Sequence, residues 1–117
     1  MAKILLVDDD HELCQLYKIR LEEAGYQIST VYDGEDALKK IQEKKPDLII
    51  LDLMLPKISG IEVLKKLKQD KKFQTIPIII FSALDNQQDK VKIADSYLIK
   101  SKTLPQKLIG EIERLLK

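Results

Sequence analysis

Apolar residues recur along the chain in two alternating patterns. Three runs of four consecutive apolar residues, at 4–7, 48–51 and 78–81, are typical of strands buried on both faces of a sheet. Between them, apolar residues recur every three or four positions, as on one face of a helix. The expected strands are 3–7, 27–32, 47–51, 77–81 and 96–99, and the expected helices are 11–24, 34–44, 60–70, a short one at about 86–93, and 103–117.

Strict alternation of strands and helices predicts an α/β fold. Such chains form a parallel sheet with right-handed crossovers and with helices on both faces. The length of 117 residues fits one domain, 1–117, since a domain usually takes about 100–200 residues.

Composition and charge exclude several classes of protein. The 20 basic and 19 acidic residues give a net charge of +1, which argues against direct nucleic-acid binding. The apolar runs are shorter than the roughly 20 residues that span a bilayer. One cysteine, Cys14, indicates a buried thiol in a cytoplasmic protein. A lysine-rich stretch is expected to be a solvated helix end: Lys65, Lys66, Lys68, Lys71 and Lys72.

The residues that follow the expected strands carry the chemistry. Ligands of open α/β sheets bind outside the carboxyl ends of the strands. Asp52, Ser82 and Lys100 follow three of these strands, and the acidic run 8–10 follows the first. One aspartate of the run can cap the next helix, and Asp52 can begin a turn. Asp52, however, stands among seven apolar residues, where burial is costly without a partner or a metal.

Carboxylates that converge at one edge of a sheet repel one another, and a divalent cation such as Mg²⁺ removes that repulsion. A lysine and a hydroxyl group opposite them suit the oxygens of a phosphoryl group. The residues alone therefore predict an acidic metal pocket for phosphoryl binding or transfer. Nucleotide binding is disfavoured because a glycine-rich phosphate loop is absent. We interpret His11 as an exposed residue of the first helical turn rather than a ligand.

Four segments together resemble the receiver domains of two-component response regulators, over essentially the whole chain. Each segment ends a strand, and they are 3–10, 46–56 with Gly60, 80–83 and 97–100. The resemblance implies a CheY-like, flavodoxin-like doubly wound (βα)5 fold with strand order 2-1-3-4-5.

The resemblance also implies a role for each acidic residue. Asp52 matches the phospho-acceptor, which takes the phosphoryl group from a phosphohistidine of a sensor histidine kinase or phosphotransfer protein. Asp8 and Asp9 match the pair that holds Mg²⁺, and the backbone carbonyl of Met54 completes the protein's share of the coordination.

Three further positions match residues that contact or report the phosphoryl group. Ser82 matches the hydroxyl residue that hydrogen-bonds the phosphoryl oxygen, and Lys100 matches the lysine that pairs with it. Tyr97 matches the aromatic residue that turns inward when Ser82 is drawn to the phosphate, so these two residues form the expected switch.

The chain departs from the family pattern at three places. Ser101 stands where the family has proline, so we expect a trans Lys100–Ser101 bond with some shift of Lys100. The interval from Ser82 to Lys100 is about four residues short, which predicts a shortened helix at 86–93. Family members commonly use the face formed by this helix, the last strand and the last helix for dimer and output contacts, and the shortening puts that use in doubt here. We expect a monomer or a weak, domain-swapped homodimer. Met54 and Leu84 are apolar and cannot orient water, which predicts slow loss of the phosphoryl group.

The leading hypothesis is a phospho-accepting receiver rather than a turnover enzyme. The alternative is a pseudo-receiver, a constitutive protein-interaction module. A phosphohydrolase would need a second acidic residue where this chain has Met54. Flavin binding would need a phosphate-binding loop, which the chain does not have, so only the fold would support it. The output partner is not predictable. Because the last expected helix ends the chain, we expect either a single-domain regulator or a segment of a longer protein.

Overall fold

The computed structural model describes residues 1–117, the side chain of Lys90 excepted. Along the chain the elements are β1 (Lys3–Val7), α1 (His11–Glu23), β2 (Gln27–Val31), α2 (Gly34–Glu43), β3 (Leu48–Leu51), α3 (Gly60–Gln69), β4 (Ile78–Ser82), η1 (Gln88–Val91), β5 (Ser96–Ile99), η2 (Lys100–Lys102) and α4 (Pro105–Leu116), where η marks a 3₁₀-helix.

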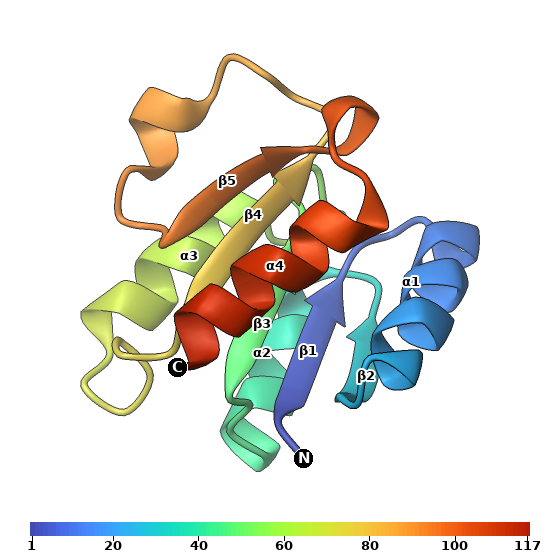
Figure 1. The fold of residues 1–117 in the computed structure, drawn as a ribbon. Helices are drawn as coiled ribbons and strands as arrows, with labels where there is room; N and C mark the ends of the chain where they lie inside the picture. Colours follow the sequence, from blue (N-terminus) through green and yellow to red (C-terminus); the bar gives the residue numbers. More distant parts are fainter.

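The strands form one parallel sheet in the order β2-β1-β3-β4-β5, and the predicted flavodoxin-like topology is confirmed. Helices α1 and α4 cover one face of the sheet, and α2 and α3 cover the other (Figure 1). All strands run in the same direction, so their carboxyl ends meet at the upper edge in this view. The two termini lie at the lower end of the molecule.

Strand β3 shows why the apolar runs predicted buried strands. Its side chains alternate between the two faces of the sheet, as in any strand. Ile49 and Leu51 join the core under α2 and α3, whereas Leu48 and Ile50 join the core under α1 and α4. Both faces are covered by helices, so all four side chains are fully buried. In the described chain no helix is both long and apolar enough to cross a membrane.

Polar side chains define where three of the helices begin. The side chains of Asp10, Asp33 and Ser59 accept hydrogen bonds from backbone N–H groups in the first turns of α1, α2 and α3. Such caps satisfy helix N–H groups that have no partner within the helix. Asp10 is therefore the residue of the acidic run that caps a helix, and Asp8 and Asp9 are available for other roles.

The connection between β4 and β5 differs from the prediction. The α-helix expected at 86–93 is instead the 3₁₀-helix Gln88–Val91. A 3₁₀-helix rises about 2.0 Å per residue against 1.5 Å for an α-helix, so it lets a short connection run back along the sheet. The last helix begins at Pro105 rather than at 103, because a 3₁₀-turn occupies Lys100–Lys102 and proline suits the first helical position. The other element ends differ from the prediction by at most one residue.

An ion pair anchors this shortened connection. The side chain of Asp95 accepts hydrogen bonds from the backbone N–H of Ile78 at 2.8 Å and from Lys68 Nζ at 3.4 Å. Lys68 Nζ also donates to the carbonyl of Ile76 at 3.3 Å. The prediction of a solvated lysine-rich helix end is therefore wrong for Lys68, while its four lysine neighbours in that stretch are exposed.

Gly60, the first residue of α3, brings that helix against the backbone that follows β3. A Cβ atom there would lie 2.1 Å from the carbonyl oxygen of Asp52 and 2.6 Å from Cα of Leu53. The Gly60 N–H donates to the Leu53 carbonyl at 3.0 Å. Gly60 thus allows a close approach that any larger residue would prevent.

We expect Gly60→Ala to lower the free energy of unfolding by about 1–3 kcal/mol, because the added methyl group overlaps backbone atoms that cannot rotate away. Gly110→Ala is the matched control: a Cβ there, in the interior of α4, meets nothing within 4 Å. Alanine should raise the stability at that position by about 0.5–1 kcal/mol. Urea unfolding measures both, and shifts of the same sign in the two variants would contradict the interpretation.

Candidate functional site

Four predicted site residues lie where strands end, at one edge of the sheet. Asp8 directly follows β1, Asp52 follows β3, Ser82 is the last residue of β4 and Lys100 follows β5. The parallel register pairs the last residue of β1 with the last residue of β3, which sets Asp8 beside Asp52. Sequence reasoning thus identified residues that the fold brings together.

Lys100 bridges the two buried carboxylates. Its Nζ lies 2.6 Å from Oδ2 of Asp8 and 3.2 Å from Oδ2 of Asp52. Asp8 is 1% exposed and Asp52 is 3% exposed, so an ammonium group is needed to offset the cost of burying their charges. The Lys100–Ser101 bond is trans, as expected, and Lys100 nevertheless reaches both carboxylates.

Burial and pairing act against each other in this cluster. Burial raises the pKa of the Asp8 carboxyl, although hydrogen bonds from Lys100 and from the Asp10 amide oppose the rise. Burial by itself would lower the pKa of Lys100, but the hydrogen bond to Asp8 and the charge of Asp52 outweigh it and raise that pKa. A raised Asp8 pKa favours a neutral carboxyl, whereas the 2.6 Å contact favours an ion pair. We favour the ion pair at neutral pH, because Lys100 stays charged.

Three carboxylates could hold a metal ion together. Asp8, Asp9 and Asp52 each offer one oxygen, and these oxygens lie within 4.8 Å of one another. Asp9 is exposed, so the site opens to solvent on that side. Three like charges at this spacing repel, and oxygen ligands of this kind suit Mg²⁺. The residues present therefore fit the predicted cation.

Met54 lies close to this cluster through its backbone. Its N–H donates to Oδ1 of Asp52 at 3.3 Å, while its side chain is exposed. This contact places the Met54 backbone beside Asp52, and coordination by the Met54 carbonyl stays a prediction.

Ser82 and Tyr97 are linked through the backbone of Leu84, a residue for which the sequence predicted only an apolar side chain. Ser82 Oγ accepts a hydrogen bond from the N–H of Leu84 at 3.3 Å, and the Tyr97 hydroxyl donates to the carbonyl of Leu84. The backbone N–H and carbonyl of Leu84 therefore connect the two expected switch residues. The position of Leu84 two residues after Ser82 is the signal that marks it.

Two residues near the site have other roles. The Cys14 thiol is buried, as predicted, and donates to the carbonyl of Asp8 at 3.4 Å. Burial raises the pKa of this thiol to about 12, so Cys14 is an inert part of the support beneath Asp8. His11 is exposed in the first turn of α1, as predicted, and its ring stacks on that of Tyr32 at 3.7 Å.

The family model described as the response regulator receiver domain matches residues 4–108. The alkaline phosphatase synthesis transcriptional regulatory protein PhoP of Bacillus subtilis is 48% identical over 102 residues, which cover 84% of this chain and 42% of that protein. The response regulator ArlR of Staphylococcus aureus is 38% identical over all of this chain and 53% of its own length. The chain thus spans about half the length of these relatives.

Solved structures of similar proteins share the fold. The response regulator TrrA of Thermotoga maritima, in complex with Mg²⁺-BeF, has a TM-score of 0.90 and 37% identity, and the match covers 99% of this chain and all of that one. The chemotaxis protein CheY4 of Vibrio cholerae has a TM-score of 0.91 and 31% identity, with 99% of both chains covered.

Removal of the bridging ammonium should destabilise the protein. We expect Lys100→Met to lower the free energy of unfolding by about 2–4 kcal/mol at neutral pH without divalent cations, because two buried carboxylates lose their partner. Chemical unfolding measures the loss. Lys102→Met, two residues on at an exposed position, is the control and should change the stability by less than about 0.5 kcal/mol. Equal effects of the two substitutions would show that Lys100 does not bridge the carboxylates.

Proposed function

Since this chain belongs to the response regulator receiver domain family, we propose that it accepts a phosphoryl group on Asp52 and signals by a change of conformation. The donor is a phosphohistidine of a sensor histidine kinase or of a phosphotransfer protein. The observation that carries the proposal is the cluster of Asp8, Asp9, Asp52 and Lys100 at the carboxyl edge of the sheet.

The reaction exchanges one bond to phosphorus for another. An oxygen of the Asp52 carboxylate attacks the phosphorus atom, the P–N bond of the phosphohistidine breaks, and the imidazole leaves with the electron pair. Lys100, already 3.2 Å from Asp52, is close enough to pair with the oxygens of the incoming phosphoryl group. Ser82 supplies a hydroxyl donor from the end of the neighbouring strand β4. Catalysis here consists of positioning and charge stabilisation.

Mg²⁺ is the proposed cofactor, held by Asp8, Asp9, Asp52 and the carbonyl of Met54. When bound, it would offset the negative charge of the carboxylates and of the phosphoryl oxygens. The complex of the Thermotoga relative with Mg²⁺-BeF supports this assignment.

Signalling begins with the hydroxyl group of Ser82. A phosphoryl group on Asp52 carries up to two negative charges, and its oxygens can accept a hydrogen bond from the Ser82 hydroxyl. A movement of Ser82 toward it would break the hydrogen bond that Ser82 Oγ now accepts from the N–H of Leu84. Because the Leu84 carbonyl also accepts from Tyr97, a shift of Leu84 changes the position of the tyrosine ring. An output protein that contacts this part of the surface detects the change.

The domain modifies itself and is not a turnover enzyme under this proposal, and its place of action is the cytoplasm. It acts as a monomer or as a weak, domain-swapped homodimer. The alternative is a pseudo-receiver that binds partners constitutively. The 3₁₀-helix Gln88–Val91 in place of an α-helix favours that alternative, while the complete set of charged residues opposes it.

Incubation with Mg²⁺ and acetyl phosphate should add one phosphoryl group to the intact chain, measured by mass spectrometry. Asp52→Asn removes the nucleophile and should abolish the mass increase. Asp47→Asn, at an exposed position just before β3 and at the opposite edge of the sheet, should leave it unchanged. EDTA should abolish labelling of the native chain. Absence of labelling under all conditions would favour the pseudo-receiver.

The phosphorylated chain should lose its phosphoryl group slowly, because Met54 and Leu84 cannot orient a water molecule by hydrogen bonding. Met54→Asn introduces an amide at an exposed position beside Asp52 and should shorten the half-life at least several-fold. Met1→Asn makes the same substitution at an exposed position far from Asp52 and should leave the half-life unchanged. This control needs an added initiator methionine before residue 1. A rapid loss that Met54→Asn does not alter would refute the explanation. The loss is followed by mass spectrometry after removal of the donor.

A further inference from the structure

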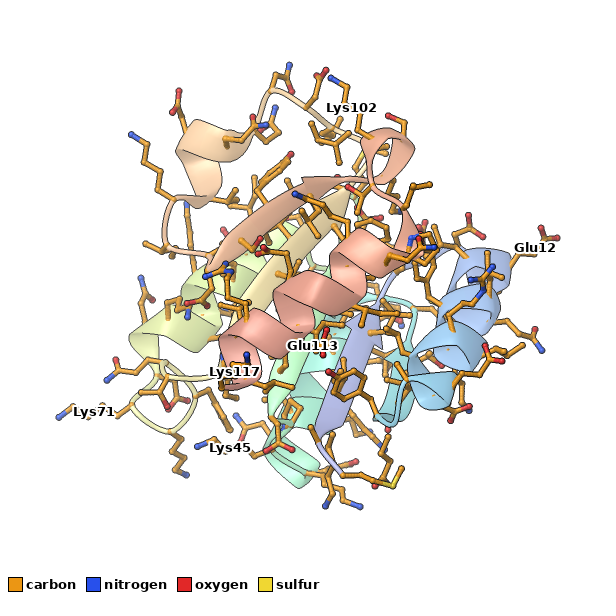
Figure 2. All side chains as sticks on the ribbon, viewed as in Figure 1. Glu12, Lys45, Lys71, Lys102, Glu113 and Lys117 are labelled. Atoms are coloured by element: carbon orange, nitrogen blue, oxygen red, sulfur yellow. The ribbon has the colours of Figure 1, made fainter. Side chains whose placement is uncertain are left out.

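A basic cleft lies at the opposite edge of the sheet from Asp52. Four lysines line it: Lys3 of β1, Lys40 of α2, and Lys44 and Lys45 of the loop that follows α2. Gln27 and Ser29 of the edge strand β2 add two neutral polar side chains. Figure 2 shows Lys45 at the lower end of the molecule, near the amino ends of the strands. Strand β1, five residues or about 16 Å long, separates this edge from Asp8.

The positive charge of the cleft is not neutralised within the described residues. Its lining contains no carboxylate, and none of its four lysines takes part in an ion pair there. Asp47 is the neighbouring acid, and its carboxylate accepts the backbone N–H of Lys3 at 2.7 Å. Asp36 and Glu43 of α2 line a neighbouring groove, which Lys40 also borders. Four lysines therefore line one cleft whose own lining holds no acidic side chain.

Helix α2 explains only part of this arrangement. Lysines near the end of a helix interact favourably with its negative pole, which accounts for Lys40 and Lys44. Lys3 lies on a strand, and its side chain has no such reason to be directed to the same cleft. The convergence of charges from three segments is what binding of an anion requires.

We propose that the basic cleft binds the terminal phosphate group of a multivalent anion. The cleft is small, with a free volume of about 30 Å³, so it does not enclose a whole phosphate group. The anion would instead contact the lysine side chains from the solvent side. Lysine ammonium groups bind phosphate as point charges, and Gln27 and Ser29 supply additional hydrogen-bond donors. A soluble polyphosphate and a phosphate-monoester lipid headgroup share this chemistry.

Pyrophosphate tests whether the cleft binds a soluble polyphosphate. The unphosphorylated chain is titrated at constant ionic strength in EDTA, so that Mg²⁺-dependent chemistry at Asp52 does not contribute, and amide shifts are followed by NMR. We expect saturable shifts at Gln27 and Ser29. Lys40→Gln/Lys44→Gln should weaken binding about fivefold or more, because two charged contacts are lost. Lys71→Gln/Lys72→Gln removes the same charge from exposed positions outside the cleft and should weaken it less than twofold.

Vesicles with and without phosphatidic acid test the lipid source in a sedimentation assay on the same three proteins. Binding by either probe that depends on Lys40 and Lys44 but not on Lys71 and Lys72 supports the cleft, and the probe that binds identifies the source. Equal weakening by the two double substitutions, shifts confined to the Asp52 edge, or no saturable binding of either probe overturns the proposal. Phosphorylation of Asp52 is measured separately, so its failure is distinguishable from failure of this site.

Discussion

One ammonium group between two buried carboxylates is the interaction on which the arrangement of this domain depends. Asp8 and Asp52 are almost completely buried, and charges in such an environment persist only when they are paired. Their partner, Lys100, directly follows β5, which lies on the far side of β4 from β3 and Asp52. Neighbouring strands are about 4.8 Å apart, so only a long side chain reaches across. The sheet must therefore keep its strand order and register, or both carboxylates lose the ion pair.

The same requirement explains the contacts around the shortened connection before β5. Lys100 reaches the carboxylates only if β5 pairs correctly with β4. The connection has a 3₁₀-helix where we expected an α-helix, so tertiary contacts must hold it. Asp95 supplies them through the backbone of Ile78 and the side chain of Lys68. On the other side of the site, Gly60 lets α3 approach the backbone of Asp52. These contacts maintain the geometry of the site from outside it.

The near-zero net charge of the chain conceals two edges of opposite character. The carboxyl edge of the sheet holds Asp8, Asp9 and Asp52, and the amino edge holds the basic cleft around Lys40 and Lys44. Partners and ligands respond to local fields within a Debye length of about 8–10 Å rather than to the net charge. The proposed phosphoryl group at the carboxyl edge and the proposed anion at the amino edge would therefore not interfere directly with each other.

Much of the fold and most of the site were predictable from the sequence, because they depend on local or periodic features. Continuous apolar runs identify strands buried on both faces, capping residues such as Asp10 mark helix starts, and the position after a strand identified Asp52, Ser82 and Lys100.

Tertiary structure alone decided how these parts meet. Several contacts join residues distant in sequence: the double contact of Lys100, the hydrogen bond from Tyr97 to Leu84, the ion pair of Lys68 with Asp95, and the meeting of Lys3 with Lys40, Lys44 and Lys45. Such contacts depend on the direction of each side chain and on the path of the connecting loops. Neither is encoded in the spacing of residue types along the chain.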